Sequence, residues 1–251
     1  MKQMERLVLA VVLTLSCAFG AGCSQAEVRY SGFLDDYSKL RPAPSGGLAM
    51  SYRKPGVDFS KYNQIILDPI LVWYSAGANF KGISPDDLKA MTDYLTQAIT
   101  KAVSGAYPVV TRPGPGVLRV RLAITDLQPT KPTLNTITSL TPAGLVLGSA
   151  AGEAGYVPTG VGEAGIEAEF LDATTNQQVA MFVDRRVGKK YDVVQGATTW
   201  GQIQGAFDAW AKLFRERLDE AHGIAPYVSP LKKKTACAED VLLSGSTKAC
   251  D

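Results

Sequence analysis

The chain contains one histidine, His222, so catalysis by an imidazole base would have to depend on that residue. In serine and cysteine hydrolases the histidine takes the nucleophile's proton and is itself oriented by a carboxylate. His222 follows a helix-like segment, at the end where the helix dipole favours a cation. We therefore interpret it as a helix-end residue. The sequence has no G-x-S-x-G elbow, HExxH motif or P-loop.

Three glycines match the dinucleotide-binding fingerprint, with the spacing Gly160-x-Gly162-x-x-Gly165. That motif should follow a strand and open a helix, because the helix N-terminus binds the pyrophosphate. Here the glycines follow a Gly- and Pro-rich stretch and enter a strand-like pattern. We expect no cofactor.

Two acidic pairs are the remaining candidates for carboxylate chemistry. Asp86 and Asp87 suit the first turn of a helix, whereas Asp35 and Asp36 have no partner visible in the sequence. A metal site would also need more ligands than one histidine and the cysteines of this chain offer. We expect no metal site, no catalytic residues and no enzymatic activity.

The start of the chain has the layout of a secretory signal peptide, which we place at residues 1–22. A short basic start and an apolar run, too short to span a bilayer, lead to small residues before Cys23. Lipoprotein processing would attach diacylglycerol to this thiol and a further fatty acid, such as palmitate, to the freed amine. Gly20 stands where a leucine is usual, so an ordinary cleaved signal with an incidental cysteine is the alternative. Ser24 is not the aspartate that often retains lipoproteins in the inner membrane, so in a Gram-negative cell we expect an outer-membrane lipoprotein facing the periplasm.

Cys237 and Cys250 lie near the C-terminus. Removal of Cys17 with the signal and acylation of Cys23 would leave them as the only pair. Export places them in an oxidising compartment, so we expect a disulfide. A free or metal-binding pair is the alternative.

The charge of the chain is nearly balanced, with 26 basic and 24 acidic residues. This balance argues against a nucleic-acid binder. We divide the chain into the signal peptide, a lipidated tether and irregular segment at residues 23–60, a folded domain at 61–224, and a tail at 225–251. In the irregular segment, Phe33, Leu34, Tyr37 and Leu40 are candidates to dock on the domain.

The periodicity of the domain predicts two long helices and several strands. The helices are expected from Ser84, a capping residue, to Gly105 and over residues 200–221. Strands are expected at 64–73, interrupted at Pro69, and at 118–127, 165–172 and 178–187. Short turns between strands favour an α+β two-layer sandwich, in which both helices pack on one face of a mostly antiparallel sheet.

Two of the alternating strands carry opposite charges on their outer faces. Arg119 and Arg121 alternate with apolar residues in one, and Glu167 and Glu169 do so in the other. If these strands are neighbours, the four side chains can form cross-strand ion pairs.

Residues 136–162 are rich in small and aliphatic residues and are nearly uncharged. Gly144, Gly148 and Gly152 recur every four residues, a spacing that permits close backbone approach. The segment is too short for a membrane helix. A small-residue loop or short helix is the plain interpretation. The alternative is a contact surface, including Leu145 and Leu147, for a partner, for self-association or for the bilayer.

Several short segments together resemble one family. They are Gly32-Phe33-Leu34-Asp35-Asp36-Tyr37, Tyr52 to Tyr62 with Lys54-Pro55-Gly56-Val57-Asp58-Phe59, Leu67-Asp68-Pro69 leading to Trp73, Pro113-Gly114-Pro115-Gly116 and Glu167-Ala168-Glu169-Phe170-Leu171-Asp172. The chain resembles the bacterial lipoprotein family described as domain of unknown function 3313, over residues 33–221. Asn176 stands where the family leads us to expect a glycine in a hairpin turn, and asparagine tolerates the same left-handed backbone. The resemblance implies an envelope lipoprotein and brings no established activity or catalytic residues.

These observations favour a non-enzymatic lipoprotein, held on a membrane by its N-terminal lipid, whose domain binds or scaffolds another envelope component or self-associates. The alternative is a periplasmic small-molecule or glycan-binding module with hydrolytic activity or without it. That alternative predicts a concave apolar pocket with converging polar groups.

Overall fold

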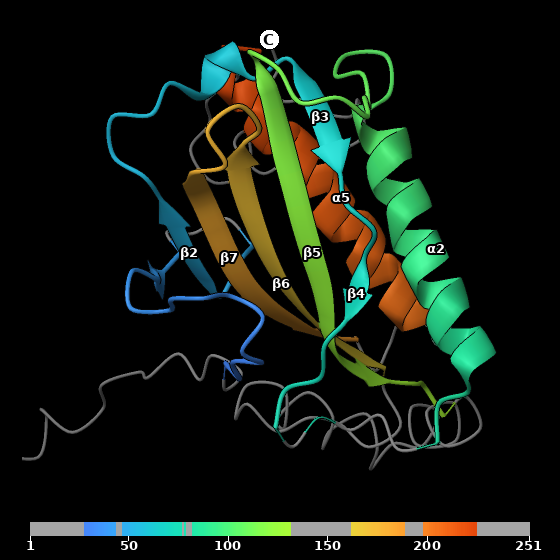
Figure 1. The fold of residues 1–251 in the computed structure, drawn as a ribbon. Coiled ribbons are helices and arrows are strands. Elements are labelled where there is room, and N and C mark those ends of the chain that lie inside the picture. The colour runs from blue at the N-terminus through green and yellow to red at the C-terminus, as the bar shows by residue number, and fades with distance from the viewer. Residues whose placement is uncertain are drawn as a thin grey trace, which may run out of the picture.

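The computed structural model describes residues 28–43, 47–76, 78, 82–131, 162–188 and 198–224. Within these ranges a sheet of seven strands accompanies two long helices, which confirms the α+β class (Figure 1). Neighbouring strands are antiparallel through most of the sheet, as expected. This antiparallel series runs β1 (Arg41–Pro42), β2 (Met50–Arg53), β7 (Gln178–Val187), β6 (Glu163–Asp172) and β5 (Val117–Gln128).

The strand expected at residues 64–73 is divided in two. β3 (Gln64–Leu67) and β4 (Leu71–Val72) both pair with β5 in parallel, in register with Val117 and Ala123 respectively. Pro69 lies between them and has no backbone N–H to give to a ladder. The predicted interruption at Pro69 is therefore confirmed.

The first long helix, α2 (Pro85–Val103), begins where its capping residue predicts. The Ser84 hydroxyl accepts a hydrogen bond of 3.1 Å from the backbone N–H of Asp87. The buried side chains of α2 recur every fourth residue, which places them on one face; they are Met91, Leu95, Ile99 and Val103. The second helix, α5, spans Gly201–Ala221.

The main hydrophobic core joins both helices to one face of the sheet. From α5 it takes Phe207 and Trp210, and from α2 it takes Leu95. The strands supply the rest of this layer with alternate residues of β5 and β6, namely Leu118, Val120, Leu122, Ile124, Ala164, Ile166, Ala168 and Phe170. Figure 1 shows α2 and α5 on the same side of the strands.

The opposite face of the sheet, here called the open face, carries a second, smaller core. Phe33, Leu34 and Leu40 pack there with Ala123, Met181 and Val183. The expected docking of the segment around Phe33 is thus confirmed. The sequence did not reveal that Met50–Arg53 would join the sheet as β2, paired with β7.

Some of the expected features lie outside the described residues. They are the signal peptide, Cys23, Cys237, Cys250, Gly144, Leu145, Leu147, Gly148 and Gly152. Among the residues that the structure does describe, neither helix is long and apolar enough to cross a membrane.

Candidate binding pocket on the open face of the sheet

The open face carries the cross-strand ion pair that the sequence predicts between Arg121 and Glu169. The two residues are direct partners on β5 and β6, and Arg121 Nη1 lies 2.5 Å from Glu169 Oε2. Gln178 Nε2 donates to the other carboxylate oxygen at 2.9 Å. The Glu169 carboxylate is therefore fully engaged, whereas the Arg121 side chain remains 38% exposed.

The predicted pairing of Arg119 with a glutamate of β6 is wrong. The strand register places Leu171 opposite Arg119, so no carboxylate lies across the ladder. Arg119 instead binds Asp68, which directly follows β3, through Nε at 3.0 Å and Nη2 at 2.9 Å. This hydrogen-bonded pair raises the pKa of Arg119 above its usual value.

Glu167 also accepts hydrogen bonds from partners that the sequence did not indicate. Its carboxylate is completely buried and accepts hydrogen bonds from the Ser31 backbone N–H at 2.7 Å and the Tyr37 hydroxyl at 2.6 Å. Burial, together with the hydrogen bond to Glu167, raises the pKa of Tyr37. The segment around Phe33 is therefore fastened to the sheet by polar bonds as well as by apolar contacts.

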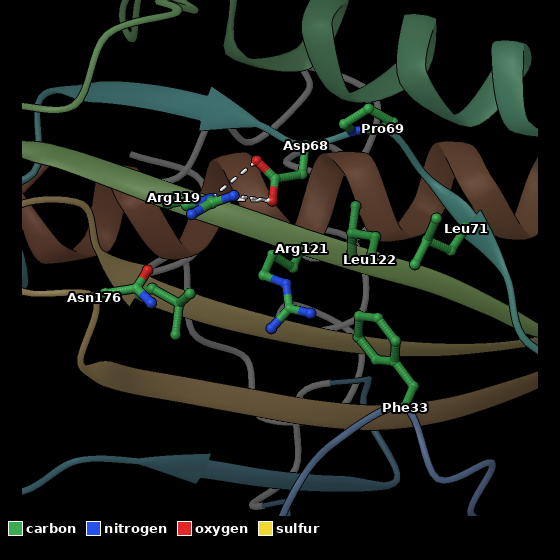
Figure 2. A pocket seen from close by; sticks show the side chains of 9 residues that line it. Phe33, Asp68, Pro69, Leu71, Arg119, Arg121, Leu122 and Asn176 are labelled. Atoms are coloured by element: carbon green, nitrogen blue, oxygen red, sulfur yellow. Dashed lines mark hydrogen bonds and ion pairs between the residues drawn. The ribbon is translucent and has the colours of Figure 1, made fainter.

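A cavity of about 360 Å³ opens on this face beside the two arginines. Its nine lining residues come from the Phe33 segment, the β3–β4 connection, β4, β5, β6 and the β6–β7 turn (Figure 2); they are Phe33, Asp68, Pro69, Leu71, Arg119, Arg121, Leu122, Leu171 and Asn176. Figure 2 shows the Arg121 guanidinium directed toward the Phe33 ring, and its carbon lies 5.5 Å from the ring centroid. We call this cavity the Arg121 pocket.

The lining of the Arg121 pocket suits binding. Phe33, Leu71 and Leu171 give it an apolar wall, and two partly exposed guanidinium groups lie beside that wall. The nine lining residues include no histidine, cysteine, serine or threonine, and Asp68 is engaged by Arg119. The two guanidinium groups can donate hydrogen bonds to a ligand oxygen that lies next to an apolar group.

A second cavity, of about 440 Å³, lies between α5, β2 and β7. Aromatic and aliphatic side chains dominate its lining, among them Phe59, Phe170, Phe182 and Phe214. Arg53 is also part of the lining, and its guanidinium carbon stacks 4.1 Å from the centroid of the Phe59 ring. This groove offers apolar surface with few polar groups to orient a ligand.

His222 occupies the helix-end position that the sequence indicates, directly after α5. Its Nδ1 lies 2.8 Å from the Leu218 carbonyl oxygen, one turn earlier. The neighbouring Tyr107 hydroxyl donates to Asp219 at 2.9 Å, and burial with this bond raises the pKa of Tyr107 to about 12. Arg215 holds the same Asp219 carboxylate at 2.8 Å. The cluster ties the end of α5 to the chain after α2.

The glycines of the fingerprint-like motif have a packing role where the structure describes them. Gly165 lies within β6, and a Cβ there would approach Thr125 Oγ1 to 2.8 Å. Gly162 precedes β6, and its N–H donates to Gln202 at 2.5 Å. The motif enters a strand, as expected, and opens no helix.

Comparison with known proteins finds sequence and structural similarity to several bacterial proteins. The uncharacterized lipoprotein YdcL of Escherichia coli (strain K12) is 30% identical over 163 residues, which cover 64% of this chain and 72% of that protein. The similar solved structures include two with TM-scores below 0.4. The PelC dodecamer of Paraburkholderia phytofirmans (TM-score 0.33, 9% identity) matches over 70% of this chain and 96% of that one. The hypothetical protein CT253 of Chlamydia trachomatis (TM-score 0.37, 9% identity) matches over 62% and 98%. The family model described as "Protein of unknown function (DUF3313)" matches residues 29–214, and the chain belongs to that family.

Proposed function

We propose that this chain is a lipoprotein of the bacterial cell envelope, anchored through Cys23, whose domain binds another envelope component and catalyses no reaction. The similarity to an Escherichia coli protein named as a lipoprotein supports the anchor, as does the run of small residues before Cys23. In a Gram-negative cell the protein would lie in the outer membrane and face the periplasm, because Ser24 is not the aspartate that often retains lipoproteins in the inner membrane.

The Arg121 pocket is the observation that carries the binding role. Arginine and aromatic residues dominate the energetic centres of protein interfaces. Here Arg121 is held by Glu169 on one side and lies beside Phe33 on the other, so its orientation is fixed before a partner arrives. Such preorganisation lowers the entropy cost of association. The pocket fits a partner segment that presents a carbonyl or carboxylate oxygen beside an apolar side chain.

The same pocket also supports a second candidate function, the binding of a small molecule or glycan. Its volume of about 360 Å³ falls within the usual range for ligand sites, roughly 300–1,000 Å³. The ion pair of Arg119 with Asp68 supplies polar groups, and Phe33 supplies an apolar wall, to which a polyhydroxylated ligand can bind.

Photo-crosslinking in native membranes tests the proposal. A crosslinking amino acid at Pro69, which is exposed and lines the pocket, is compared with one at Lys212, whose side chain is 72% exposed on α5. We expect a specific protein adduct from position 69 that disappears with Arg121→Ala and is absent from position 212. Equal labelling from both positions contradicts the proposal. A pocket-dependent glycan adduct without a protein adduct favours the second candidate.

A further inference from the structure

Three exposed apolar side chains gather around the Phe33 segment. Tyr30 is 44% exposed, Leu71 42% and Trp73 46%, and exposed apolar side chains that lie together mark contact surfaces. The Trp73 ring meets Phe33 edge-on at 6.2 Å, and Leu71 lines the Arg121 pocket together with Phe33. Tyr30 pairs with the Tyr37 ring of the same segment at 4.4 Å. We call Tyr30, Leu71 and Trp73 the Trp73 patch.

The Trp73 patch lies toward the C-terminal end of β5. The Trp73 backbone N–H donates to the Ile124 carbonyl at 2.8 Å, and Arg29 lies 3.6 Å from Asp126. Figure 1 shows β4 running into this lower end of the sheet. The first described residues of the chain and the patch therefore share one end of the domain.

The proposed lipid anchor constrains which end of the domain can meet the membrane, and this step rests on the proposed function. Five residue steps separate Cys23 from Val28, and a fully extended chain spans at most about 3.6 Å per residue, or roughly 18 Å in total. β5 has 12 residues and is about 40 Å long at the usual rise per residue. The tether is thus too short for the far end of the sheet to lie on the bilayer.

We propose that the Trp73 patch rests on the bilayer that holds the lipid anchor, with Tyr30 and Trp73 at the level of the lipid headgroups. Tryptophan and tyrosine prefer this interface because their rings are apolar and carry one polar group. The exposed Lys131, just beyond the end of β5, stands on the same side and suits the headgroup region. In this orientation the Arg121 pocket, which shares Leu71 with the patch, opens next to the membrane surface.

The contact depends on apolar burial more than on attraction to anionic lipid. Asp86 and Asp87 begin α2 at the same end of the domain and oppose a negative surface (Figure 1). We therefore expect the contact to be nearly insensitive to salt.

Fluorescence quenching tests the orientation with the full acylated chain in phosphatidylethanolamine vesicles that carry brominated acyl chains. The chain has three tryptophans, Trp73, Trp200 and Trp210. We expect brominated chains to quench the wild type, with most of that quenching lost in Trp73→Phe and retained in Trp200→Phe. Equal quenching in wild type and Trp73→Phe overturns the proposal. Protection of Trp73 from aqueous acrylamide without quenching by brominated chains also overturns it, because a protein surface then covers the patch.

Intact mass separates this inference from the function on which it rests. A chain without acyl groups on Cys23 contradicts the proposed anchor. An acylated chain whose Trp73 is not quenched contradicts only the orientation.

Discussion

The Tyr37 hydroxyl donates a hydrogen bond of 2.6 Å to Glu167, a carboxylate with no solvent exposure. A buried carboxylate is costly unless each oxygen is paired, and here the Ser31 N–H serves the other oxygen at 2.7 Å. Both donors belong to the segment that also places Phe33 in the Arg121 pocket. The carboxylate of Glu167 thus makes the stability of the sheet depend on the Phe33 segment.

Tyr37→Phe should therefore lower the free energy of unfolding by about 1–3 kcal/mol, because it leaves one oxygen of a buried charge without its donor. Urea unfolding measures the loss, and hydrogen exchange should show faster opening of residues 31–40. Tyr30→Phe is the matched control, since the Tyr30 side chain is 44% exposed, and it should be nearly neutral. If the two variants change the free energy of unfolding equally, the buried Glu167 carboxylate does not depend on the Tyr37 hydroxyl and the prediction is wrong.

Arg185 and Glu163 form an ion pair that is almost withdrawn from solvent, with side-chain exposures of 11% and 1%. Arg185→Met should lower the free energy of unfolding by about 3–5 kcal/mol, because it strands a buried carboxylate. The double variant with Glu163→Gln should recover much of that loss. Chemical denaturation of the wild type, both single variants and the double variant measures the coupling, and strictly additive effects would contradict it.

The pH dependence of Arg185→Met has a definite sign. Burial raises the pKa of Glu163 above its ordinary value even with Arg185 present, and removal of the guanidinium should raise it further. A carboxyl with a raised folded pKa binds more protons in the folded state, so stability falls as pH rises through that range. The loss of unfolding free energy in Arg185→Met, relative to wild type, should be largest near pH 7 and should become smaller as the pH falls toward about 4. A deficit that does not change with pH would contradict this account.

Asp172 closes the hairpin between β6 and β7 and has the opposite pH behaviour. Its hydrogen bond with Lys61 Nζ at 2.9 Å, supported by Tyr62 and by backbone N–H groups of the turn, lowers the pKa of this carboxyl well below its usual range. A lowered folded pKa stabilises the fold above the unfolded value of about 3.9, and this contribution is lost as pH falls further.

Asp172→Asn should consequently lower the free energy of unfolding near pH 7 by about 1–3 kcal/mol. The difference from wild type should narrow below about pH 4, where the aspartate itself becomes protonated in the unfolded chain. Lys61→Gln, which removes only one of the partners, should have a smaller effect. Thermal unfolding from pH 7 to pH 3 measures all three proteins, and a wild-type-like Asp172→Asn variant would refute the assignment.

Local patterns account for the parts of the fold that could be predicted from the sequence. Ser84 followed by Pro85 marks the start of α2, because capping chemistry is local. Alternation in β5 and β6 sets which residues face the helices, and it also predicts the Arg121–Glu169 pair once those strands are neighbours. Asn176 adopts the left-handed backbone (φ 57°) that the expected glycine would have supplied.

The remaining features depend on pairings between segments far apart in the chain. Asp68 reaches Arg119 only because β3 lies parallel to β5, and no local pattern encodes that crossover. Glu167 looks like a solvent-facing residue in an alternating strand, yet the Phe33 segment covers it. The lining of the Arg121 pocket depends on both the β3–β5 pairing and the position of the Phe33 segment. It therefore could not be predicted from the sequence.

Leu145 and Leu147 remain predicted contact residues, outside the described part of the chain. The described residues on either side of that stretch are Lys131, just after β5, and Gly162, just before β6. Since Gln128 pairs with Glu163, the two described flanks leave the sheet side by side at the C-terminal end of β5. If it touches a partner or the bilayer, Leu145→Glu with Leu147→Glu should change complex size or membrane retention while the melting temperature stays near wild type. Lys212→Glu, a charge change at an exposed position of α5, is the control. Unchanged complexes and membrane retention in a folded double variant would leave the stretch without a contact role, because two buried carboxylates at a real interface cost several kcal/mol.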